Sequence, residues 1–112
     1  MKYLHNPRCR KSREGLSLLE SKGLNPSIIL YLNEPPSKKE IAEIINFLNI
    51  SPIDLIRKSE GVFKEKYKGK ELSDSDYINA MHENPILIER PILINNNKAI
   101  IGRPPEKVLE II

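Results

Sequence analysis

The sequence of 112 residues contains one cysteine, Cys9, and no tryptophan. A single cysteine cannot form an internal disulfide, and with only two histidines it offers too few ligands at suitable spacing for a zinc site. We therefore expect no metal and no bound cofactor. An unpaired cysteine is typical of the reducing cytoplasm, which is the compartment that the sequence favours.

Long apolar runs are also missing. The longest wholly apolar stretch is the short run at residues 28–32, whereas a membrane-spanning helix needs about 20 such residues. The first residues lack the apolar core of a signal peptide. The sequence therefore predicts a soluble protein without a membrane partner, folded as a single domain over residues 1–112.

Excess positive charge is confined to one short segment. The chain carries 18 Lys and Arg against 15 Asp and Glu, a net charge of +3. Residues 8–13 alone hold four cations and no anion, so the rest of the chain is nearly neutral. Aromatic residues make up only 5% and do not alternate with a basic stripe, so nucleic-acid binding is not expected. The basicity surrounds Cys9.

The first third of the chain has the pattern of a β-α-β unit. Residues 2–5 form a candidate strand that Asn6-Pro7 ends, and residues 10–22 have the apolar spacing of a helix. The apolar run at residues 27–32 is bounded by prolines and predicts a buried strand. Two strands joined by a helix in this way are expected to be parallel.

The rest of the chain is expected to be a helical insertion followed by a hairpin and a helix. The insertion covers approximately residues 37–83, and its helices begin at capping signals on Ser37, Ser51 and Ser73. Residues 92–94 and 99–101 flank an asparagine-rich turn, which favours a β-hairpin. A closing helix follows over residues 106–112. The fold class is therefore α/β, with a mixed sheet in the order β-α-β, helical insertion, β-β-α.

The position of Cys9 favours a reactive thiol. It lies where the first strand leads into a helix, so its sulfur faces free backbone N–H groups and the positive end of the helix dipole. Those groups and the neighbouring cations stabilise a thiolate. Ser12, one turn along, could donate its hydroxyl proton to the sulfur. The alternative is a small, buried structural cysteine, which the polar neighbours disfavour.

Arginine is the less common cation in the chain, yet it recurs at places suited to an anion site. Three arginines lie at or near the ends of apolar elements: Arg57, Arg90 and Arg103. The planar guanidinium group binds two oxygens of a tetrahedral oxyanion at once, so convergence of these side chains on Cys9 would build such a site. Each arginine could instead be merely exposed. His5 is either a modulator of the cysteine pKa or an ordinary residue at the end of a strand.

Five motifs in order along the chain form a joint pattern that is more specific than any of them alone. They are His5-Asn6-Pro7-Arg8-Cys9-x-x-Ser12-Arg13, Leu30-Tyr31-Leu32 ahead of Pro35-Pro36, Leu55-Ile56-Arg57, the segment of residues 82–91, and Gly102-Arg103-Pro104-Pro105-Glu106. This pattern resembles the glutaredoxin-coupled arsenate reductase family over essentially the whole chain. The resemblance implies a thioredoxin-like mixed sheet with a helical insertion. It also implies a cis bond between Arg90 and Pro91 close to the cysteine.

The resemblance also assigns roles to individual residues. Cys9 matches the nucleophile, and His5 matches a residue that helps to lower the cysteine pKa. Ser12 takes the place of the second cysteine of dithiol thioredoxin-like proteins. Three arginines match those that hold the oxyanion: Arg57, Arg90 and Arg103. Arg10 and Lys11 depart from the small residues found after the cysteine in established members, and the sequence leaves their roles and that of Arg8 open.

The expected function is reduction of arsenate to arsenite through a covalent adduct on Cys9. Because the chain has no second cysteine, the electrons must come from external thiols, and the family implies glutathione as co-substrate and glutaredoxin as partner. A monomer is expected. Two alternatives remain: a monothiol, glutathione-dependent reductase of another substrate, and a thioredoxin-like regulator that binds RNA polymerase.

Overall fold

The structure is a computed structural model that describes residues 1–112. The chain forms two compact units. The first, which we call the sheet unit, combines Met1–Glu34 with Arg90–Ile112. The second, the helical unit, is the intervening segment Pro35–Glu89. None of the helices has both the length and the apolar character that crossing a membrane requires.

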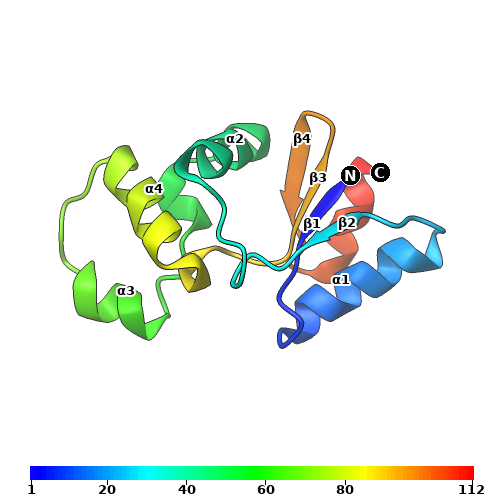
Figure 1. The fold of residues 1–112 in the computed structure, drawn as a ribbon, viewed down its shortest axis with the longest axis horizontal. Helices are drawn as coiled ribbons and strands as arrows, with labels where there is room; N and C mark the ends of the chain where they lie inside the picture. The colour runs from blue at the N-terminus through cyan, green and yellow to red at the C-terminus, as the bar shows by residue number, and fades with distance from the viewer. The chain divides into compact units, whose positions relative to one another are not determined.

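The sheet unit is built on a four-stranded mixed sheet (Figure 1). Its strands lie in the order β2-β1-β3-β4, with bounds β1 Lys2–Leu4, β2 Ser27–Ile29, β3 Ile92–Asn95 and β4 Lys98–Ile101. β1 pairs parallel with β2 and antiparallel with β3, and β3 pairs antiparallel with β4. The expected α/β class, the parallel first pair and the closing hairpin are confirmed. The hairpin turns at Asn96, which adopts a left-handed φ of 56°.

The second strand is shorter and more exposed than the sequence predicts. β2 ends at Ile29, and the chain then turns with the N–H of Asn33 donating to the carbonyl of Leu30. Ile28 is 43% exposed, because β2 is an edge strand of the sheet. The prediction of a buried strand over residues 27–32 was therefore wrong. The apolar run instead places Tyr31, beyond the strand, in the interior.

Two helical segments pack together in the sheet unit. Helix α1 (Arg10–Ser21) and the 3-10 helix η3 (Pro105–Ile111) lie side by side, and η3 also contacts β3 and β4 (Figure 1). Gly23, with φ of 75°, follows α1 and donates its N–H to the carbonyl of Glu20. The core between these elements consists of fully buried side chains from four segments of the unit: Tyr3, Leu19, Leu93 and Val108.

The helical unit contains α-helices joined by short 3-10 turns. Its elements are α2 (Lys38–Leu48), η1 (Pro52–Leu55), α3 (Gly61–Lys66), α4 (Asp74–Glu83) and η2 (Pro85–Leu87). The predicted starts at Ser37 and Ser73 are confirmed as capping boxes, in which the serine hydroxyl accepts from the N–H three residues on. The helix expected after Ser51 is only one 3-10 turn, because Ile56 turns to extended backbone and bridges to Ile88.

Candidate active site

The backbone of the loop between β1 and α1 fixes the position of Cys9. Cys9 is the N-cap residue of α1, and its carbonyl accepts from the N–H of Arg13 at 3.1 Å. The carbonyl of Asn6 accepts from the N–H of Cys9 at 2.9 Å, and the Asn6 side-chain oxygen accepts from the N–H of Arg8 at 3.0 Å. The half-buried thiol is thus held at the positive end of the helix dipole.

Beneath this loop lies a buried polar network centred on Ser12. The Ser12 hydroxyl oxygen is 2.7 Å from Nδ1 of His5 and accepts from the N–H of Asn6 at 3.0 Å. The Tyr3 hydroxyl donates to the Ser12 carbonyl at 2.6 Å. All four residues are buried. The Ser12 hydroxyl, which the sequence suggests as a donor to the sulfur, is therefore engaged by the loop and by His5.

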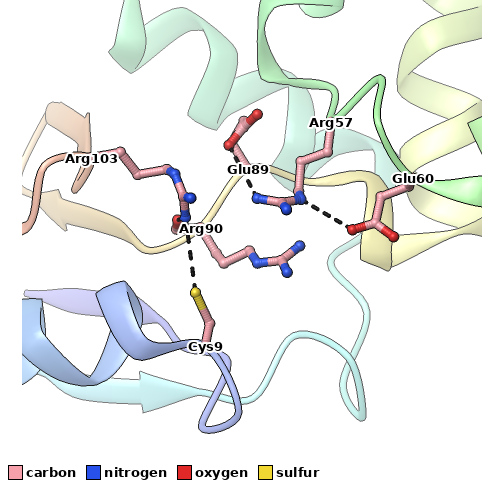
Figure 2. Close-up of polar contacts among 6 residues, drawn as sticks. All are labelled: Cys9, Arg57, Glu60, Glu89, Arg90 and Arg103. Carbon is pink, nitrogen blue, oxygen red and sulfur yellow. Dashed lines mark hydrogen bonds and ion pairs between the residues drawn. The ribbon is translucent and has the colours of Figure 1, made fainter.

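Two of the three expected arginines act on Cys9 within the sheet unit. Nη1 of Arg103 lies 3.9 Å from the Cys9 sulfur and donates to the carbonyl of Arg90 at 3.0 Å (Figure 2). The Arg90–Pro91 peptide is cis, as the resemblance implies. Gly102 lets the chain pass close to Pro91, because a Cβ at Gly102 would lie 2.8 Å from Cγ of that proline. The close approach carries Arg103 to the thiol.

The pKa of the Cys9 thiol is lowered by its surroundings. Burial is the largest single influence and acts in the opposite direction, because it disfavours the charged thiolate. The backbone N–H of Ser12 and hydrogen bonds from the Arg90 and Arg103 side chains together outweigh it, and the charge of Arg90 adds to them. The site therefore favours the nucleophilic form of the sulfur.

The surroundings of His5 favour its neutral imidazole form. Burial lowers its pKa, and the charge of Arg13 lowers it further against a smaller opposing effect of Glu20. His5 is not among the groups that lower the pKa of Cys9. What the structure gives His5 is a hydrogen bond to Ser12, whose N–H does act on the thiol.

The third expected arginine, Arg57, belongs to the helical unit. Its Nε lies 3.2 Å from a carboxylate oxygen of Glu60, and its Nη1 lies 3.7 Å from one of Glu89 (Figure 2). Its backbone N–H donates to the carbonyl of Leu87 at 2.7 Å. The side chain is only 19% exposed and is held between two acids. The sequence alone does not predict the ion pair between Arg57 and Glu89, because these two residues lie far apart along the chain.

Three residues of the site were not predicted to be functional from the sequence: Tyr3, Gly102, and Asn6, which was expected only as part of a turn and a motif. Asn6 is the most recognisable in retrospect, since asparagine before proline commonly bonds to the backbone two residues on. Tyr3 and Gly102 act through contacts with distant segments, which no local pattern predicts. No group of three or more His, Cys, Asp or Glu side chains is placed to hold a metal ion.

Comparison with known proteins places this chain in a family. The model of the ArsC family matches residues 4–111. An arsenate reductase of Haemophilus influenzae is 46% identical, covering 96% of this chain and 95% of that protein, and the uncharacterized protein YfgD of Escherichia coli K12 is 45% identical, covering 100% and 96%. The solved structure of an arsenate reductase from Vibrio cholerae is 44% identical with a TM-score of 0.94, covering 100% and 98%. The chain belongs to the ArsC family.

Proposed function

We propose that the protein reduces arsenate to arsenite, with Cys9 as the nucleophile and external thiols as the source of electrons. The observation that carries this proposal is a thiol of lowered pKa set between a helix N-terminus and the guanidinium of Arg103. Such a site attracts a tetrahedral oxyanion and holds the attacking thiolate beside it. Relatives named arsenate reductases, similar over almost the whole chain, support the choice of oxyanion.

In the first step the Cys9 thiolate attacks arsenic and water leaves. One proton is taken up, so that H₂AsO₄⁻, the thiolate and H⁺ give the adduct Cys9–S–AsO₃H⁻ and H₂O. Arsenic stays pentavalent. Arg90 and Arg103 stabilise the negative charge on the arsenic oxygens, and the free N–H groups of α1 add to this effect.

In the second stage external thiols supply two electrons. Glutathione replaces an oxygen of the adduct with loss of a second water. A glutaredoxin thiol then attacks the glutathione sulfur, which forms a mixed disulfide and leaves an electron pair on arsenic. Hydrolysis of the trivalent adduct releases arsenite and restores the Cys9 thiolate. The chain has no second cysteine that could do this internally.

The test is arsenate-dependent oxidation of NADPH in a mixture with glutathione, glutaredoxin and glutathione reductase. We expect turnover that requires every component and disappears in Cys9→Ser, which should retain the wild-type circular dichroism spectrum and melting temperature. Residual turnover above a few per cent in a folded Cys9→Ser protein would contradict the assignment of Cys9 as the nucleophile. Absence of arsenate turnover with a fast-reacting Cys9 would favour a monothiol reductase of another substrate instead.

A further inference from the structure

The hydroxyl group of Tyr3 reaches from strand β1 into the first turns of helix α1. It donates to the carbonyl of Ser12 at 2.6 Å, and the Tyr3 side chain is fully buried. Gly15 leaves room for it, because a Cβ at that position would lie 2.5 Å from the hydroxyl oxygen. The direction of this O–H bond is therefore fixed relative to the helix, and it points from the sheet toward the Ser12 carbonyl.

A directed series of hydrogen bonds connects this hydroxyl to the N-terminus of α1. The Ser12 carbonyl shares a peptide group with the N–H of Arg13, which donates to the carbonyl of Cys9 at 3.1 Å. The Cys9 carbonyl in turn shares a peptide group with the N–H of Arg10, the first residue of α1. The first N–H groups of a helix have no acceptor within the helix. The series thus begins at Tyr3 and ends at an N–H that is available to an anion.

Hydrogen bonds arranged in series strengthen one another. A carbonyl that accepts a hydrogen bond polarises its peptide group, so the N–H of that group becomes a stronger donor. The N-terminal N–H groups of α1 form the positive end of the helix dipole, which stabilises a thiolate or an oxyanion. The Tyr3 hydroxyl therefore adds to the positive potential at Cys9. The same hydrogen bond holds Ser12 in place, and the N–H of Ser12 lowers the pKa of Cys9.

The hydroxyl acts here as a protonated donor. Burial raises the pKa of Tyr3 above its ordinary value and outweighs the Ser12 side chain and the backbone of Leu16, which lower it. The charge of Cys9 raises the pKa of Tyr3 further, so the thiolate and the hydroxyl interact electrostatically. Tyr3 consequently keeps its proton over the pH range in which the thiol ionises, and its O–H dipole is present throughout.

We propose that Tyr3 is a positioning residue of the active site, whose hydroxyl acts through the Ser12 carbonyl to orient and polarise the first turn of α1 around the Cys9 thiolate. This inference rests on the proposed function, because it concerns the same nucleophile. It gives a role in the reaction to a side chain of β1 that acts through backbone groups of the helix.

The experiment measures the pH dependence of alkylation of Cys9 by iodoacetamide, in which the thiolate displaces iodide and forms a thioether. In Tyr3→Phe the midpoint should rise by roughly 0.3–0.6 pH unit, a two- to four-fold loss of thiolate well below the midpoint. Gly15→Ala keeps the hydroxyl but displaces it from Ser12, so it should give a similar rise. The double variant should rise no further than Tyr3→Phe, because both changes remove the same hydrogen bond.

Two control variants separate this effect from general changes in stability and charge. Leu19 is buried in the same core cluster as Tyr3 but has no polar group. Leu19→Val should lower the melting temperature and keep the wild-type midpoint. Lys22→Gln, which removes an exposed cation at the other end of α1, should also keep it. Circular dichroism spectra and melting temperatures verify that every variant is folded.

An unchanged midpoint in folded Tyr3→Phe overturns the proposal. An equal rise in Leu19→Val also overturns it, because the midpoint would then follow the stability of the core. Additive rises in the double variant contradict the route through Ser12. If Tyr3→Phe does not fold, Gly15→Ala carries the test, and an unchanged midpoint there overturns the proposal. No arsenate is used, so a negative arsenate assay leaves these results intact and the two proposals fail separately.

Discussion

The reactivity of Cys9 depends on a few side chains, and the pH profile of its alkylation measures their effect. The lowered pKa of the thiol predicts that the rate with iodoacetamide rises to half its plateau below the value of about 8.5 found in free cysteine. Arg103→Gln should move this midpoint upward, because it removes the cation 3.9 Å from the sulfur. Lys22→Gln should leave it in place. A midpoint that does not move in Arg103→Gln would show that the contact does not act on the thiol.

His5 makes a separate prediction about stability. Its pKa is lower in the folded chain than the ordinary value of about 6.5, so the unfolded chain binds more protons between those two values. The contribution of His5 to the free energy of unfolding is therefore fully present above pH 6.5, and it is lost as the pH falls toward the pKa of His5 in the folded chain. Urea denaturation between pH 5 and 7 should show this slope, and His5→Gln should flatten it.

The matched control for that measurement is His82→Gln. His82 lies in the helical unit, where its Nδ1 is 2.9 Å from the carbonyl of Pro36. If both histidine variants change the slope equally, the effect does not belong to the buried network of Ser12. If only His5→Gln changes it, the imidazole beneath the loop is the group that titrates.

At the scale of elements, the Tyr3 hydroxyl of strand β1 lies so close to Gly15 of helix α1 that no side chain fits there. A Cβ on Gly15 would lie 2.5 Å from the Tyr3 hydroxyl oxygen, whereas its next neighbours on Val108 and Pro91 are at 3.5 and 3.6 Å. Gly15→Ala should therefore destabilise the wild type by about 1–3 kcal/mol, since the buried hydroxyl must move from Ser12.

The same substitution should behave differently when the hydroxyl is absent. In the Tyr3→Phe background the alanine meets only ordinary contacts and has the better helix propensity, by roughly 1 kcal/mol. Gly15→Ala should then be neutral or stabilising. Urea denaturation of the wild type, the two single variants and the double variant measures the free energy of coupling between Tyr3 and Gly15. If the changes in the free energy of unfolding are additive, an alanine at Gly15 does not clash with the Tyr3 hydroxyl.

Elements that depend on local chemistry could be predicted, and those that depend on assembly could not. The capping boxes at Ser37 and Ser73 and the turn at Asn96 are encoded by a few adjacent residues and were confirmed. The burial of β2 depends on whether another strand lies beyond it, and the sheet ends there. The lowered pKa of Cys9 was predicted from its helix position and neighbouring cations, whereas the effect of Arg90 and Arg103 on that pKa was not, because these arginines were expected to bind the oxyanion.

At the scale of the whole molecule, the thioredoxin-like sheet unit is made of two segments that the helical unit separates in sequence. The later segment ends in η3, whose Val108 is fully buried with Tyr3 and Leu19. Truncation before Pro105 should abolish the cooperative thermal transition of the sheet unit, because it uncovers α1 and the core. Deletion of Ile112 alone, which is 50% exposed, should have little effect.

If the truncated chain aggregates, a single substitution in η3 still tests whether this segment stabilises the sheet unit. Val108→Ala removes two buried methyl groups and should cost about 2 kcal/mol in the free energy of unfolding, measured in urea. An unchanged free energy in this variant would mean that η3 does not contribute to the core. The expected loss would instead place the closing segment among the elements that hold Cys9 and Arg103 together.

The order of the site residues along the chain has a consequence for protein synthesis. Cys9 leaves the ribosome well before Arg90 and Arg103, and β1 has no antiparallel partner until β3 is made. Until then Arg90 and Arg103 cannot lower the pKa of the thiol, so a smaller fraction of it is thiolate at neutral pH than in the folded protein. The nascent chain therefore carries a sulfur that oxidises or captures arsenic more slowly than in the folded protein, and folding of the finished chain completes its activation.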